Sequence, residues 1–132
     1  MSSSNRVLVD SSVWIEFFRG STSPNLDRLI EEDLICTNDI ILTELIPSLI
    51  KNGNKEAANS LLSIHRVPLD INWDIIREYQ VLNLKKGINK VGIADLIIIQ
   101  QVIFDKLTLH TLDKHFQLMQ KHLNFETLNT SL

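Results

Sequence analysis

The chain has 132 residues, of which 44% are hydrophobic and 22% are charged, and its formal net charge is −3. This length predicts one domain with its own core, and the acidic balance excludes a globally basic, nucleic-acid-binding surface. No apolar run reaches the roughly 18 residues of a membrane span, and the N-terminal MSSSNR lacks the apolar stretch of a signal peptide. The single cysteine, Cys36, excludes an internal disulfide and a multi-cysteine zinc site. We therefore expect a cytoplasmic protein.

Apolar periodicity and turn residues predict a regular series of elements. In chain order we expect a strand at 6–9, helices at 11–18 and 25–33, a strand at 34–36, helices at 40–51 and 54–65, a strand at 66–71, helices at 73–86 and 91–105, a strand at 107–112, a helix at 113–122 and a strand at 125–128. Ser11 or Ser12 is expected to cap the first helix. Thr37, Asn38 and Asp39 are expected to be cap residues of the third helix, and Asp39 is assigned to capping alone. Pro47 lies inside the third helix and should kink or end it.

Strands that alternate with helices predict an α/β domain with a mainly parallel sheet. The chain has no internal repeat, low-complexity segment or linker, so we expect a single domain over 1–132. Sites in such folds lie at the carboxyl ends of the strands. Asp10 ends the first strand, and Asp113 follows the strand at 107–112, so both acids should lie on the same edge.

Two further acids interrupt apolar sequence. Glu44 lies in IILTELI, and Asp95 lies in GIADLIII, in the first turn of the most apolar helix. A carboxylate at a helix N-terminus gains only about 0.3–1 kcal/mol, and acids are seldom buried without a partner. Each acid alone has an ordinary explanation, as a cap, a turn residue or part of a solvated helix face. The four together, each on a core element, instead indicate a shared site.

The motifs around these acids resemble those of a known family. VLVDSSVWIEFF, LTEL, GIADLIIIQ and HTLDKHF are similar, in this order, to the acidic motifs of PIN domains, in particular the VapC toxins of toxin–antitoxin pairs. The resemblance extends over essentially the whole chain. It implies a PIN-like three-layer domain with a central, mostly parallel sheet flanked by helices. It also implies an endoribonuclease that depends on Mg²⁺ or Mn²⁺.

The resemblance implies a role for individual residues as well. Asp10, Glu44, Asp95 and Asp113 would be the catalytic acids and the metal ligands, with Ser11 and Thr111 as supporting polar groups. Carboxylates that are crowded together repel one another, and a hard cation such as Mg²⁺ suits an all-oxygen ligand set. The partners implied are an RNA substrate, a VapB-like antitoxin and a second copy of the chain. The apolar residues on more than one face of SSVWIEFF also predict an interface.

An RNA substrate requires positive charge near the site. Candidate phosphate contacts are Arg19, Lys85, Lys86, Lys90 and Lys114, although any one of these can equally be a solvated surface residue. The four histidines lack the spacing of a helical zinc pair and are interpreted as structural or surface residues. The sequence departs from the family pattern at Pro47 and at the pair Gln100–Gln101, which stands where the family usually has small residues.

Other α/β proteins that handle phosphate fit less well. A haloacid-type phosphatase needs a second aspartate two positions after the first, where this chain has Ser12. A receiver domain needs an acidic neighbour for Asp10 and a lysine after the last strand, and FETLNTSL supplies none. A PIN-like interaction module without catalysis remains the alternative from another functional class.

Overall fold

The computed structural model describes residues 6–21 and 24–128. The strands are β1 (Val7–Val9), β2 (Ile35–Cys36), β3 (Thr108–His110) and β4 (Glu126–Thr127). The helices are α1 (Ser11–Phe18), α2 (Pro24–Glu31), α3 (Asp39–Lys51), α4 (Lys55–Leu62), α5 (Trp73–Lys85), α6 (Ile93–Phe104) and α7 (Lys114–Met119). Among the described residues, none of the helices combines the length and the apolarity needed to cross a lipid bilayer.

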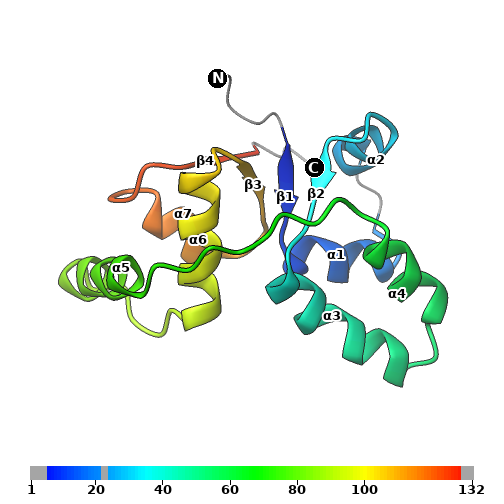
Figure 1. Ribbon diagram of the computed structural model, residues 1–132, viewed down its shortest axis with the longest axis horizontal. Coiled ribbons are helices and arrows are strands. Elements are labelled where there is room, and N and C mark those ends of the chain that lie inside the picture. Colours follow the sequence, from blue (N-terminus) through cyan, green and yellow to red (C-terminus); the bar gives the residue numbers. More distant parts are fainter. Residues whose placement is uncertain (1–5, 22–23, 129–132) are drawn as a thin grey trace.

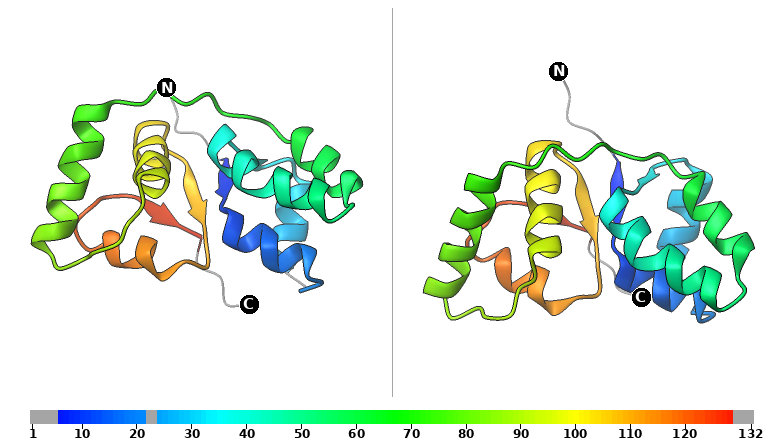
Figure 2. Two further views of the ribbon diagram at one scale, coloured as in Figure 1. Left: turned by 90° about the horizontal axis from the view of Figure 1, so that it is seen from below. Right: turned by 60° about the horizontal axis from the view of Figure 1, so that its bottom comes forward.

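The four strands form one parallel sheet in the order β2-β1-β3-β4 (Figure 1). Val9 of β1 pairs with His110 of β3, so the ends of these two central strands lie at the same level. Helices α1 to α4 gather beside β1 and β2, and α5 to α7 gather beside β3 and β4 (Figures 1 and 2). The predicted α/β fold with a parallel, helix-flanked sheet is confirmed.

The hydrophobic core includes β-branched and aliphatic residues of strand β1 and helix α6. All of β1 is buried, and α6 is buried without interruption from Leu96 to Val102. That pattern follows from a helix that is apolar on every side, which must be surrounded by protein. Cys36 is also buried, and burial raises the pKa of its thiol to about 12, so the thiol stays protonated and unreactive.

The aromatic residues of α1 pack mainly within the chain itself. Trp14 is buried, and the rings of Phe17 and Phe18 lie 5.7 and 5.8 Å from its ring. Ile15 is the large apolar side chain of this helix that stays exposed. Most of the apolar surface that predicted an interface on α1 is therefore used in this aromatic cluster.

Two predictions about helix α3 hold only in part. Of its predicted cap residues, Asn38 is the cap, since its side chain accepts a hydrogen bond from the amide of Ile41. The assignment of Asp39 to capping is wrong, because Asp39 is the first helical residue and pairs with Arg66 at 3.3 Å. Pro47 does not end the helix, which continues to Lys51. Pro47 is on an exposed face of α3, so water can satisfy the carbonyl that loses its helical partner.

The strand predicted at 66–71 is also wrong. This segment makes one isolated bridge, between Thr37 and Arg66, and then crosses from α4 to α5 without a ladder (Figure 1). Side-chain amides of Gln100 and Gln101 hold its backbone instead, through Asp70, Val67 and Pro68. Apolar periodicity could not reveal this, because the partners are two glutamines 30 or more residues away.

Candidate active site

Asp10 lies where β1 ends and α1 begins. Its amide donates to the carbonyl of His110 at 2.9 Å, which extends the pairing of β1 with β3 by one residue. Its side chain is buried and makes no capping hydrogen bond to α1. Asp10 itself occupies the N-cap position, so the expectation that Ser11 or Ser12 caps this helix is wrong, and the Asp10 carboxylate does not make the capping bond considered for it.

Two hydroxyl groups hold the Asp10 carboxylate in place. Oδ2 of Asp10 accepts hydrogen bonds from Oγ of Ser12 at 2.8 Å and from Oγ1 of Thr111 at 2.9 Å. Each hydroxyl also accepts a backbone amide, Ser12 from Leu112 and Thr111 from Asp113, both at 3.0 Å. The start of α1 and the turn after β3 are thereby joined at one carboxylate. One oxygen of Asp10 is saturated, and the second is left for another partner.

Thr111 was predicted as a supporting group, whereas Ser12 was not. Ser12 was considered only as a cap and as the position where a phosphatase would need aspartate. The available signal was its spacing, since a hydroxyl two residues after a carboxylate at a helix start can reach back to it. Ser11, which was predicted, lies beside Glu44 instead, and its hydroxyl lowers the pKa of that carboxyl.

Glu44 and Asp95 lie on two different helices, and the pKa values of both are raised by neighbouring acids. Loss of hydration, followed by repulsion from Asp113 and Asp10, raises the pKa of Asp95 to about 6, and nearby His115 opposes the rise. The pKa of Glu44 is raised by the same causes, first loss of hydration and then repulsion from Asp10 and Asp95, even though part of this residue remains exposed. These mutual effects connect all four predicted acids in one electrostatic group.

Asp113 has a structural role in addition to its charge. It precedes α7, and its Oδ1 accepts the amide of His115 at 2.9 Å, which is the capping bond considered for it. The same oxygen lies 3.2 Å from Nδ1 of His115. Sequence reasoning gave His115 no part in the site. Its position two residues after an aspartate, at the start of a helix, was the signal that pointed to this contact.

Whether these acids suit a metal ion depends on their donor chemistry and their spacing. All four offer carboxylate oxygens, the donors that Mg²⁺ and Mn²⁺ prefer. In residues 6–21 and 24–128, however, no three carboxylate, imidazole or thiol side chains lie close enough together to enclose an ion. Mg²⁺ is usually held by one or two carboxylates and keeps several waters, so an open group of acids fits it better than it fits a structural zinc.

The five predicted basic residues are all exposed. Arg19 pairs with Glu16 at 3.2 Å, and Lys114 begins α7, directly after Asp113. Lys85 and Lys86 end α5, and Lys90 lies in the loop that leads to α6 and Asp95. Lys90 and Lys114 are thus close in sequence to two of the acids, and their part in RNA binding stays a prediction.

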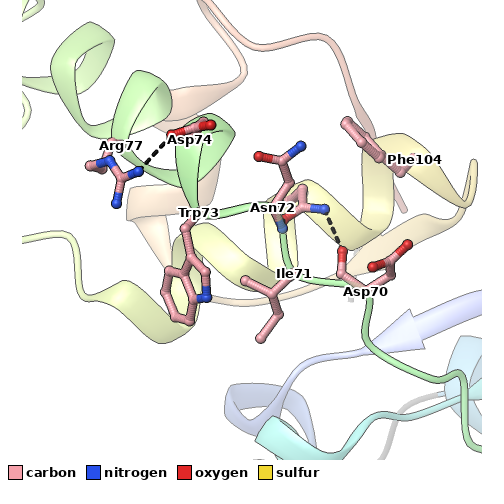
Figure 3. A pocket seen from close by; sticks show the side chains of 8 residues that line it. Asp70, Ile71, Asn72, Trp73, Asp74, Arg77 and Phe104 are labelled. Carbon is pink, nitrogen blue, oxygen red and sulfur yellow. Dashed lines mark hydrogen bonds and ion pairs between the residues drawn. The ribbon is translucent and has the colours of Figure 1, made fainter.

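A surface pocket of about 430 Å³ lies away from the acids. Its lining includes Asp70, Trp73, Arg77 and Phe104, from the crossing segment, α5 and the end of α6 (Figure 3). Arg77 is paired with Asp74 at 2.6 Å. None of the predicted site residues lines this pocket, so it is not part of the acidic site.

Comparisons with known proteins identify the family and the fold. A family model described as PIN domain matches residues 7–121. A VapBC2 structure from Rickettsia felis, bound to a DNA fragment from its promoter, has a TM-score of 0.75 and 19% identity, over 95% of this chain and 98% of that one. FitAcB from Neisseria gonorrhoeae has a TM-score of 0.73 and 22% identity, over 93% and 96%.

A third similar structure is VapC20 of Mycobacterium tuberculosis, described as a sarcin-ricin-loop-cleaving toxin. It has a TM-score of 0.64 and 13% identity, over 94% of this chain and 99% of that one. Curated protein sequences give no match. At these identities the solved structures establish a common fold, and the family model covers far more than half of the chain. The chain therefore belongs to the PIN domain family.

Proposed function

We propose that this protein is a divalent-metal-dependent endoribonuclease and the toxin of a VapBC-type toxin–antitoxin pair. The observation that carries the proposal is the state of Asp10, a buried carboxylate that does not cap its helix and is oriented by two hydroxyls. Membership of the PIN family and the similarity to proteins of VapBC pairs support the same function.

The proposed metal centre uses the four acids on the edge where the central strands end. Asp10, Glu44, Asp95 and Asp113 would hold Mg²⁺ or Mn²⁺, which when bound supplies an activated water and stabilises charge on a phosphate. Ser12 and Thr111 hold Oδ2 of Asp10, and this fixes the orientation of the other oxygen, Oδ1. Loss of hydration and mutual repulsion raise the pKa values of Glu44 and Asp95, and a bound cation would oppose this rise because it favours the charged carboxylates.

The exposed basic residues would bind the RNA backbone beside the acids. Lys90 and Lys114 are the best placed, since each lies next to an element that carries one of the acids. Lys85, Lys86 and Arg19 are further candidates. Phosphate contacts of this kind position the substrate and carry no sequence information, so they do not determine which RNA is cleaved.

The proposed partners are a VapB-like antitoxin and a second copy of the chain. The similar structures from Rickettsia felis and Neisseria gonorrhoeae are VapBC2 and FitAcB, which supports an antitoxin partner for this chain. Support for the homodimer from α1 is reduced, because Trp14 is buried within the chain.

The test is RNA cleavage by the purified protein in Mg²⁺ and in EDTA. We expect cleavage in Mg²⁺, none in EDTA, and loss of most cleavage in Glu44→Gln and Asp95→Asn. Asp27→Asn, which changes an exposed first-turn acid of α2, is the matched control and should cleave like the wild type. Equal cleavage by the wild type and both site variants, or cleavage in EDTA, would contradict the proposal. An absence of cleavage in every condition would favour the interaction module.

A further inference from the structure

We infer that Asn38 and Gln101 are positioning residues, which fix the helix that carries Glu44 against the helix that carries Asp95. This inference rests on the proposed function, because it concerns how the acids of that site are held. Nδ2 of Asn38 donates to Oε1 of Gln101 at 2.7 Å, and both side chains are buried. Asn38 begins α3, and Gln101 lies in α6, so one hydrogen bond joins the two helices.

In both glutamines of α6, the amide nitrogen and the amide oxygen each have a hydrogen-bond partner. Gln101 also donates to the carbonyls of Val67 and Pro68, each at 3.2 Å. Gln100 donates to the carbonyl of Asp70 at 2.8 Å and accepts the amide of Asn72 at 2.9 Å, where the crossing segment passes (Figure 3 shows Asp70 and Asn72). A buried amide without partners is costly, so this pair makes sense only with the crossing segment in place.

Asn38 has two functions in one side chain. Its Oδ1 accepts the amide of Ile41 at 2.9 Å and thereby starts α3, while its Nδ2 reaches Gln101. The direction of α3 is therefore set by the same group that anchors it to α6. Glu44 lies six residues beyond Asn38, and Asp95 lies six residues before Gln101, each on a continuous helix. Because each helix is rigid, fixing the helix at this hydrogen bond also fixes the position of its acid.

The acids supply the force that the anchor resists. Glu44 and Asp95 repel each other, and Asp10 repels both. Without a cation this repulsion tends to separate α3 from α6. A short, buried hydrogen bond between the helices limits how far the two acids can separate, so less rearrangement is needed when an ion binds.

The chain offers a matched control for a purely structural role. Gln101→Met and Gln100→Met each remove one buried amide of adjacent residues in α6, and each frees backbone groups of the crossing segment. Only Gln101 is bonded to α3. Asn38→Ser is a second, milder variant, since serine retains a capping oxygen but cannot reach Gln101. It keeps the inference testable if Gln101→Met does not fold.

The experiment measures the Kd of Mn²⁺ by titration calorimetry for the full chain, with thermal unfolding in EDTA beside it. We expect Gln101→Met and Asn38→Ser to bind Mn²⁺ about tenfold more weakly than the wild type, in line with the effect of losing groups behind metal ligands. Gln100→Met should lose similar stability but keep the affinity of the wild type. On RNA, kcat should fall in the first two variants and KM should not.

Two results overturn the inference in distinguishable ways. If the wild type binds Mn²⁺ and cleaves RNA, but Gln101→Met and Gln100→Met have equal Mn²⁺ affinity, the amide pair is structural and the proposed function stands. If the wild type neither binds Mn²⁺ nor cleaves RNA, the proposed function fails and the positioning role fails with it.

Discussion

Asp95→Asn should stabilise the metal-free protein at neutral pH. The pKa of Asp95 is raised from 3.8 to about 6 in the folded protein, chiefly by loss of hydration. The folded state therefore binds a proton more tightly than the unfolded chain does. The contribution of Asp95 to the free energy of unfolding is fully present below about pH 4 and is lost as the pH rises through about 6. Above that pH the carboxylate is ionised in a poorly hydrated site near other acids.

The magnitude follows from the pKa difference. A difference of this size corresponds to about 3 kcal/mol at pH 7. Asp95 is only partly buried, so screening by solvent reduces this contribution. We therefore expect Asp95→Asn to raise the free energy of unfolding by about 2 kcal/mol at pH 7 and to give no gain at pH 4.

The assay is urea unfolding of the wild type and of Asp95→Asn in EDTA between pH 4 and pH 8. The difference between the two proteins isolates the contribution of Asp95 from all other titrating groups. Asp27→Asn changes a first-turn acid that is exposed and outside the acidic group, and it should lose a few tenths of a kcal/mol at most. Asp95→Asn with stability equal to or below that of the wild type at pH 7 would refute the reasoning.

Three further predictions concern other parts of the site. Mn²⁺ should raise the melting temperature of the wild type and raise that of Asp10→Asn much less, measured by thermal scans with and without EDTA; equal shifts would leave Asp10 a structural residue. Ser12→Ala and Thr111→Val should each lower the free energy of unfolding in urea by about 1 kcal/mol and lower the rate of RNA cleavage. Ser60→Ala removes an exposed hydroxyl that is bonded within α4 and should change neither quantity. Normal cleavage by both site variants would count against the role of the hydroxyls. Expression of the chain should arrest growth, and co-expression of the product of an adjacent small reading frame should relieve the arrest; unaffected growth would argue against a toxin.

The positions of the acids were predictable from the sequence because they follow from topology. Asp10 and Asp113 each follow a central strand, and parallel strands end on one edge of a sheet. Glu44 and Asp95 were predictable because carboxylates interrupt sequence that otherwise reads as buried helix. The sheet and nearly all helices were predictable for the same reason, since short apolar strands alternate with periodic helices along the chain.

Other features depend on partners that are remote in sequence. The choice between Ser11 and Ser12 as the support of Asp10 depends on how α1 leaves the sheet, which local propensity does not determine. The segment at 66–71 has strand-like composition, but its backbone partners are the side chains of Gln100 and Gln101. In the sequence these two glutamines could be recognised only as a departure from the family pattern. The structure shows that their side chains bind the backbone of the crossing segment.

The central claim is that four carboxylates act together on one divalent cation. Calorimetric titration of Mn²⁺ into the wild type and into single amide variants of the four acids tests it most directly, with Asp27→Asn as the control. We predict that the wild type and the control bind Mn²⁺ alike, and that Asp10→Asn, Glu44→Gln, Asp95→Asn and Asp113→Asn all bind it more weakly while keeping their folded structure. Unchanged Mn²⁺ affinity in two or more of these four variants would contradict the account.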